Sequence, residues 1–257
     1  MSACRLLPVL PDRRRIFRGR RRLLRSWPLL LSPVATAARG EEGAGRERGM
    51  LGSGMLTLYT FGDSILDCGH YNPHGVHPGQ LLVRNDDSLF PEFKGRDLVS
   101  RGPAQLDHRA VDGATIAGLG GQALGLRPQV PGVALLTVGG NDLIRGLAAD
   151  TGPGLIAFEK TLRAFLTRLP IRPVLLGTVY DPTFGKDELN FLSVEPRIAR
   201  ANHRRVNDII TAAGERFGKA VDLHAHFLRG GPSWFTRTIE PSLLGASEVR
   251  RAFLAAL

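Results

Sequence analysis

The chain has 257 residues, of which 43% are apolar and 23% are charged, with 31 Gly and 17 Pro. This is the composition of a globular protein, and the length suffices for one α/β domain with extra sequence at one end. No run of about 18 apolar residues occurs, so we expect no transmembrane helix. The two cysteines, Cys4 and Cys68, form neither a disulfide framework nor a zinc-ligand pattern, a count that suits either a reduced compartment or a cysteine-poor secreted domain.

The net charge of +10 is concentrated at the start of the chain. Residues 1–54 contain 12 Arg, no Lys and 4 acidic residues, a net of +8, which leaves a net of only +2 for residues 55–257. A strongly basic protein often binds nucleic acid or membranes. Because the basic character belongs to the first segment, we divide the chain into a basic N-terminal extension (1–54) and a domain (55–257), and we expect no specific nucleic-acid partner.

The basic extension has two competing interpretations. A run of arginines, a short apolar stretch and an A-x-A site at Ala35–Ala37 are similar to a secretory signal peptide. Prolines break the apolar stretch, and Met50 and Met55 lie just before the first predicted strand, so we favour a disordered extension or an over-long start. The expected location is the cytoplasm, or outside the cell if residues 1–37 act as an export signal. An arginine arm for phosphate groups is a third possibility.

Short β-prone runs alternate with helical patterns along residues 55–257, as in a parallel sheet covered on both faces. We therefore predict an α/β fold, a three-layer doubly wound sandwich with a mainly parallel sheet of roughly five strands. The predicted strands are Leu56–Phe61, a run near Asp97–Val99, Gly132–Val138, Pro173–Tyr180 and Ala220–His224, and the predicted helices are Leu155–Leu169, Pro196–Phe217 and Gly245–Leu257.

Chemically useful residues follow two of the predicted strands. Ser64 comes directly after the first strand, where a following helix can present N–H groups to developing negative charge. Asn141 comes after the strand that ends near Val138, and its amide can donate to an oxyanion, a contact worth roughly 3–4 kcal/mol in a serine hydrolase. Asn141 and Asp142 could instead simply cap the next helix. Ligands of doubly wound sheets bind outside the carboxyl ends of the strands, where both segments lie, but taken alone Asn141 and Asp142 favour the capping interpretation.

Taken together, three segments resemble the sequence blocks of the GDSL, or SGNH, hydrolase family. Phe61–Ser64 is similar to block I, Asp112–Thr115 to block II and Val138–Asp142 to block III. The resemblance runs from about Leu56 to the C-terminus. It implies that Ser64 is the nucleophile and that Gly113 and Asn141, with the Ser64 amide, form the oxyanion hole.

The last family block departs from the pattern. The family reads Asp-x-x-His, commonly followed by Pro-Asn and then a Gly that opens the terminal helix. Pro241 and Gly245 set the register here, so Glu240 stands at the histidine position and Arg237 at the aspartate position. A serine needs a neighbouring base, and glutamate, with an ordinary pKa near 4.3, is a poor one unless burial raises its pKa. An ion pair with Arg237 would act in the opposite direction.

Three alternatives follow for the base. Glu240 could serve as a weak or environmentally tuned base. A histidine could replace it, and His224 and His226 are the candidates because they would share one face of the last strand if that strand extended so far. The site could also bind an ester, acyl or sugar-like ligand without efficient turnover. His203, in a polar stretch, is predicted on a solvated helix face.

The loop after Ser64 contains His70, His74 and His77. Histidines invite a metal interpretation, but no second group of ligands lies nearby, so we favour substrate contact and predict no metal. The resemblance implies an esterase-like hydrolase that acts on a small ester and needs no cofactor. The rival is a catalytically weak or inactive binding protein of the same fold. The sequence does not determine the oligomeric state or the ester.

Overall fold

The computed structural model describes residues 54–257. The basic extension, with its possible export signal, lies outside the described residues except for Gly54. Within residues 54–257, no helix is both long enough and apolar enough to cross a membrane. The free cysteine of this part of the chain, Cys68, is buried.

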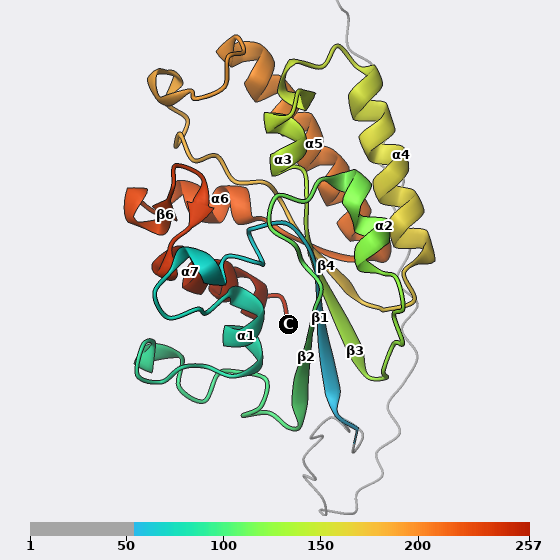
Figure 1. Cartoon of the computed structure of the whole chain (residues 1–257), viewed down its shortest axis with the longest axis vertical. Coiled ribbons are helices and arrows are strands. Elements are labelled where there is room, and N and C mark those ends of the chain that lie inside the picture. Colours follow the sequence, from blue (N-terminus) through green and yellow to red (C-terminus); the bar gives the residue numbers. More distant parts are fainter. Residues whose placement is uncertain (1–53) are drawn as a thin grey trace, which may run out of the picture. The chain divides into compact units, whose positions relative to one another are not determined.

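In the described part of the chain, five parallel strands form a central sheet in the order β2-β1-β3-β4-β5 (Figure 1). This confirms the predicted doubly wound α/β fold with its five-stranded sheet. The strands are β1 (Leu56–Gly62), β2 (Ala104–His108), β3 (Gly132–Thr137), β4 (Val174–Gly177) and β5 (Gly218–Val221), and a two-stranded hairpin is formed by β6 (Phe235–Thr236) and β7 (Glu240–Pro241).

Between Gly54 and Leu257, seven α-helices accompany the strands. They are α1 (Pro78–Val83), α2 (Leu119–Gln122), α3 (Gly140–Ile144), α4 (Pro153–Arg168), α5 (Pro196–Phe217), α6 (Leu223–Leu228) and α7 (Leu243–Leu254). Short 3₁₀ helices lie at Gly69–Tyr71, Pro91–Phe93, Ile116–Gly118, Leu147–Ala149, Asp187–Leu189 and Pro232–Trp234.

The central strands β1, β3 and β4 are largely buried on both faces, which gives the sheet a core on each side. Alternate residues of β1 point in opposite directions: Phe61 packs with α4 and α5, while Leu58 packs with α1 and α7. Figure 1 shows α2, α3, α4 and α5 on one side of the sheet and α1, α6 and α7 on the other. The near-continuous apolar runs of the strands are therefore those of a sheet covered twice.

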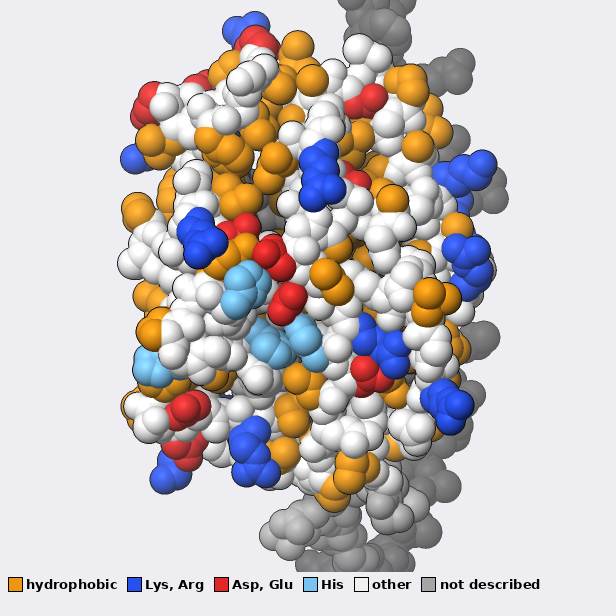
Figure 2. All heavy atoms as spheres, in the orientation of Figure 1, with side chains coloured by type: hydrophobic (Ala, Val, Ile, Leu, Met, Phe, Trp, Pro, Cys, Tyr) orange, Lys and Arg blue, Asp and Glu red, His pale blue; other side chains and the backbone are white. Residues whose placement is uncertain are grey.

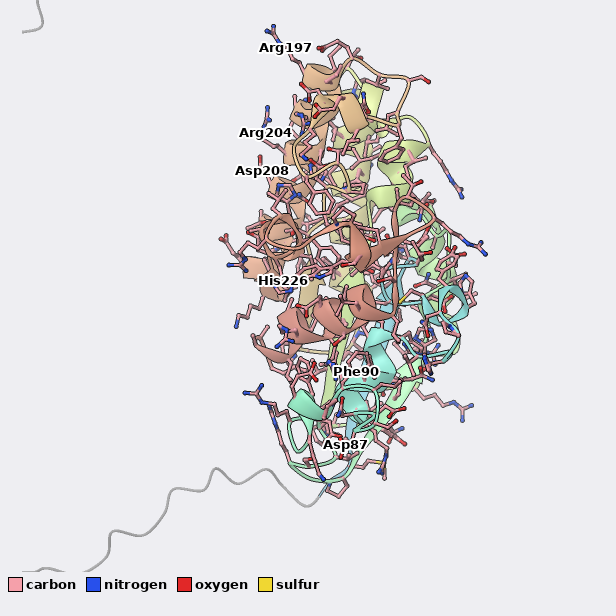
Figure 3. All side chains as sticks on the ribbon, turned by 90° about the vertical axis from the view of Figure 1, so that its left-hand side faces the viewer. Asp87, Phe90, Arg197, Arg204, Asp208 and His226 are labelled. Carbon is pink, nitrogen blue, oxygen red and sulfur yellow. The ribbon has the colours of Figure 1, made fainter. Side chains whose placement is uncertain are left out.

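The long helix α5 shows how sequence period sets packing. Its inward residues Val206 and Ile210 are almost fully buried against the first core. Arg197, Arg204 and Asp208 point away from the helix into solvent (Figure 3). This is the 3.6-residue period from which the helix was predicted, and the observed bounds equal the predicted ones.

The predicted strand near Asp97–Val99 is wrong. The Asp97 carboxylate instead accepts hydrogen bonds from the backbone of Asn85 and Ser100, and Leu98 N donates to Leu82 O at the end of α1. These contacts make a turn. The strand that completes the five-stranded sheet is instead β2. It is a half-buried edge strand, and its polar sequence did not indicate a strand.

The predicted last strand is also too long. It ends at Val221, and the Asp222 carboxylate then accepts a hydrogen bond from Ala225 N and caps α6. His224 and His226 therefore lie on a helix and not on a strand. Two residues apart on a helix, they point in different directions.

Candidate active site

The strand order reverses between β1 and β3, because β2 lies on one side of β1 and β3 on the other. In such sheets the crevice for a ligand opens outside the carboxyl ends of the strands at this point. Ser64 follows β1 and Asn141 follows β3. The topology therefore brings the two predicted site residues to one crevice.

A tight turn after β1 presents Ser64. Gly62 has φ 117°, and a Cβ atom on it would lie 1.7 Å from Thr137 O of the neighbouring strand, so only glycine fits. Gln122 of α2 holds this glycine through both its backbone N and O, at 2.7 and 2.8 Å. The Ser64 residue itself is 7% exposed and lines a cavity.

Asp63 is completely buried behind the serine. Its Oδ1 accepts hydrogen bonds from Thr137 Oγ1 at 2.8 Å and from Ile65 N at 3.2 Å. Burial raises the pKa of this carboxyl to about 6 despite these two bonds. Its contacts are to the ends of β1 and β3, so Asp63 anchors the turn on which Ser64 lies.

Asn141 and Gly113 are brought together by the loops after β3 and β2. Asn141 Nδ2 donates to Ala114 O at 3.1 Å, and the Asp142 carboxylate accepts from Ile116 N at 3.1 Å. Gly113 has φ 72°, and its carbonyl accepts from Arg145 at 3.0 Å. The amide nitrogen of Asn141 carries two hydrogens, so one remains for a ligand.

Glu240 lies on β7 with its carboxyl next to Ser64. Burial raises the pKa of Glu240, and the Ser64 hydroxyl is the strongest opposing influence, lowering the pKa by hydrogen bonding. The negative charge of Asp112 raises the pKa further, whereas His70 and Arg237 lower it. The Oε2 atom of Glu240 is buried and has no hydrogen-bond partner among residues 54–257. The carboxyl is thus close to the serine but incompletely satisfied by the described part of the protein.

The turn that carries Glu240 is conformationally unusual. Arg237 (φ 46°) and Thr238 (φ 76°) both lie in the left-handed region, which is rare for residues other than glycine and costly for a β-branched one. Tyr180 Oη donates to Ile239 O at 2.6 Å. The Arg237 guanidinium lies over the Tyr71 ring, 5.0 Å from its centroid. These contacts fix the turn from both sides.

A polar cluster surrounds the other side of the site. The Asp112 carboxylate accepts from Tyr71 Oη at 2.7 Å and lies 3.2 Å from His70 Nε2. The backbone N of Asp112 donates to Asp67 at 2.9 Å, and Asp67 in turn lies 3.3 Å from His108. Figure 2 shows histidine and acidic side chains gathered near the middle of this face. The sequence identified the histidine loop but not its partners, which come from another part of the chain.

The histidines of this loop do not form a metal site. His77 is buried, and its ring stacks on His108 with centroids 4.1 Å apart. Burial, reinforced by the neighbouring His108, lowers the pKa of His77 to about 4. Among residues 54–257 no group of three or more His, Cys, Asp or Glu side chains is arranged to hold a metal ion.

The other candidate histidines have different partners. His226 (Figure 3) lies 2.9 Å from Glu248 of α7. His224 packs against His203 with ring centroids 4.9 Å apart. Neither lines the cavity that contains Ser64. His203 does, and the prediction that it lies on a solvated face is wrong: it is half-buried, with Nε2 2.8 Å from Val179 O, and burial lowers its pKa.

The cavity beside Ser64 has a volume of about 120 Å³ and opens to solvent. One wall consists of Ser64 and the segment from Gly140 to Ala148, and the other of residues from Val179 to His203. The site thus combines a serine, an amide donor, a partly buried carboxyl and an adjacent apolar cavity.

Comparisons with known proteins identify the family and the fold. Residues 60–245 match the model of the GDSL-like lipase/acylhydrolase family. Among solved structures, the α/β hydrolase enzyme LAE5 from the metagenome of Lake Arreo, Spain, is 24% identical, with a TM-score of 0.56 over 81% of this chain and 97% of that one.

Two further structures have the same fold. A single-residue variant of Axe2, an acetyl xylan esterase from Geobacillus stearothermophilus, is 21% identical, with a TM-score of 0.57 over 80% of this chain and 95% of that one. A member of the lipolytic G-D-S-L family from Veillonella parvula is 16% identical, with a TM-score of 0.56 over 79% and 98% of the two chains. No curated protein sequence matches the chain. Since the family match spans most of residues 54–257, the chain belongs to the GDSL-like lipase/acylhydrolase family.

Proposed function

We propose that this protein is a serine esterase that hydrolyses a small ester through Ser64, with Glu240 as the base. The observation that carries the proposal is the half-buried Glu240 carboxyl beside Ser64, with one oxygen that no group of residues 54–257 satisfies. Family membership supports hydrolysis of an ester bond. The Arg237-x-x-Glu240 segment then replaces the family's usual Asp-x-x-His.

In the first half-reaction, Glu240 accepts the hydroxyl proton as Ser64 Oγ attacks the carbonyl carbon of the ester. The negative charge moves to the carbonyl oxygen, where the Ser64 N–H, the Gly113 N–H and Asn141 Nδ2 stabilise it. The C–O bond to the alcohol breaks, and the leaving oxygen takes the proton from Glu240. Water then attacks the acyl-serine, with Glu240 again accepting and returning the proton, and the acid is released.

A carboxylate can do this work only if its pKa approaches the working pH. Burial raises the pKa of Glu240, and the charge of Asp112 acts in the same direction. Arg237 has the weakest of the influences on this pKa, and its guanidinium lies over Tyr71. The opposing ion pair considered from the sequence is thus a minor effect.

The second candidate is a binding protein of this fold with little or no turnover. The glutamate at the usual histidine position favours it, because an ordinary carboxylate is a weak base. Both candidates require the crevice and the cavity. They differ in whether Ser64 reacts.

Labelling with a fluorophosphonate distinguishes the two. We expect the full chain to be labelled, Ser64→Ala to lose labelling completely, and Glu240→Ala to react at least ~100-fold more slowly, as expected for loss of a general base. His224→Ala and His226→Ala serve as matched controls and should react as the wild type does. A folded wild-type protein that is not labelled would contradict the esterase proposal and favour the binding protein, and loss of labelling in either histidine variant would assign the base to that histidine.

A further inference from the structure

The cavity beside Ser64 is mainly apolar. Its walls include Leu143, Ile144 and Ala148 on one side and Val179, Leu192 and Ala199 on the other. Leu143 and Ala148 are almost completely buried within the first core. Such a lining favours an aliphatic group over a sugar or a charged group.

The charged and polar groups of the cavity wall already have partners. Arg200 lies 3.1 Å from Asp181 and 2.6 Å from Asp187, so both of its charged nitrogens are paired. His203 is held against Val179 O, and burial lowers its pKa, which keeps the ring neutral at pH 7. Of the described residues that line this wall, no cation is therefore left to receive a carboxylate at the far end of a ligand.

The position of the base decides which half of the ester faces the cavity. The proton acceptor must lie beside the leaving oxygen, because it returns its proton there. Ser64, Asn141 and Ile239 line the cavity, whereas Gly113 and Glu240 itself do not. The alcohol half therefore leaves on the side of Glu240, where Asp112 and His70 make a polar surface.

We infer that the apolar cavity receives the acyl chain, and that the substrates are esters of medium-length aliphatic acids, hexanoyl to octanoyl, in preference to acetyl esters. This rests on the proposed serine esterase function. The solvent-facing edge of the cavity supports it, since Phe191 and Ile144 are 43% and 42% exposed there. A bound chain would cover these exposed apolar side chains.

Chain length provides the test. The full-length protein is assayed for kcat/KM with p-nitrophenyl acetate, butanoate, hexanoate and octanoate. Burial of each methylene is expected to raise kcat/KM about fourfold, so hexanoate should exceed acetate by on the order of 100-fold. A kcat/KM that is flat or falls from acetate to hexanoate would overturn the inference.

A substitution on α5 locates the effect. Ala199→Phe places a ring in the cavity, and we expect it to remove the gain from acetate to hexanoate, measured as the ratio of the two kcat/KM values. Ala212→Phe on the exposed side of the same helix is the matched control and should keep the wild-type profile. An unchanged profile in Ala199→Phe would contradict the inference.

A second variant covers the case in which Ala199→Phe fails to fold. Phe191→Ser removes an exposed apolar side chain at the edge of the cavity and should reduce the ratio of kcat/KM for hexanoate to that for acetate severalfold. An unchanged ratio would count against the inference. Fluorophosphonate labelling of Ser64 separates the two proposals. A labelled enzyme that prefers acetate contradicts only the acyl-chain inference, whereas a folded protein without labelling contradicts the esterase function itself.

Discussion

Glu240 combines a partly buried carboxyl with an oxygen that no group of the described residues satisfies. An unpaired buried polar atom costs roughly 1–3 kcal/mol, so folded proteins rarely keep one without a function. In the proposed reaction this cost has a chemical use, because the same desolvation that leaves Oε2 unsatisfied also raises the pKa of the Glu240 carboxyl and makes it a better proton acceptor.

The pH dependence of activity tests this at the level of one residue. Glu240 accepts a proton only when ionised, so kcat/KM should fall as the pH decreases through its raised pKa, which lies above that of an ordinary glutamate. Glu240→Gln keeps the size of the side chain but removes the base. We expect kcat/KM to fall about 10²–10⁴-fold and its decrease at acidic pH to disappear. Measurement is by a pH–rate profile, with the exposed Glu159→Gln on α4 as control. A decrease at acidic pH that persists in Glu240→Gln would assign it to another group.

At this scale the sequence predicted the residues whose placement is local. Ser64 and Asn141 were expected in one crevice because each follows a predicted strand of the same parallel sheet. Gly113 was expected there from the family resemblance alone, since the strand β2 before it was not predicted. The partners of the histidine loop could not be predicted in this way. Asp112 is 42 residues from His70, and their contact depends on how β2 is placed beside β1.

The helix α7 is the element that supports the Glu240 hairpin. Ser242 caps its first turn, and a Cβ atom on Gly245 would lie 2.0 Å from Trp234 O, so the helix and the hairpin are in close contact. Arg250 on this helix is 1% exposed, donates to Asn85 and lies 3.4 Å from the centroid of the Phe93 ring. Through these contacts Arg250 holds α7 against the loop that follows α1.

Removal of this arginine should therefore destabilise the protein. Arg250→Ala leaves Asn85 Oδ1 without its donor and loses the packing on the aromatic ring, and we expect a decrease of about 2–4 kcal/mol in the free energy of unfolding. Arg251→Ala, one residue away and partly exposed, should cost less than about 1 kcal/mol. Urea denaturation measures the free energy of unfolding of both variants. Equal decreases in the two would contradict the role of Arg250 in holding α7 in place.

At the scale of the element, helices and strands could be predicted where their apolar residues recur with a clear period. The 22 residues of α5 repeat an apolar face, and its bounds were predicted correctly. The edge strand β2 was not predicted because only part of it is buried and its sequence contains Gln and Asp. Asp97–Val99 was predicted as a strand, but in the structure this segment forms a turn through hydrogen bonds with Asn85, Leu82 and Ser100. Tertiary contacts decided both cases.

Across the whole domain, the two cores meet at the sheet, and Asp63 is buried at its ligand-binding edge. Its pKa is raised to about 6 from an ordinary value near 3.8, so the folded protein binds this proton more tightly than the unfolded chain does. The free energy of unfolding must then fall as the pH rises between these two values.

Asp63→Asn removes this dependence. Between about pH 4 and pH 6 the wild-type protein should lose up to about 3 kcal/mol of stability more than the variant loses, because each pH unit between the two pKa values contributes about 1.4 kcal/mol. Urea denaturation at a series of pH values gives the comparison, and only the difference between the two proteins is used because other groups titrate in both. Parallel curves would show that Asp63 is ionised in the folded protein throughout this range.

The left-handed backbone at Arg237 and Thr238 has a consequence for protein engineering. Thr238, β-branched at φ 76°, is where a designer seeking thermal stability would first introduce glycine, because strain of this kind costs on the order of 1–3 kcal/mol. Yet this turn presents Glu240 to Ser64, and a freer backbone would hold the carboxyl less firmly. Under the proposed function, thermal stability and turnover therefore make opposite demands on Thr238, and selection for one alone would reduce the other.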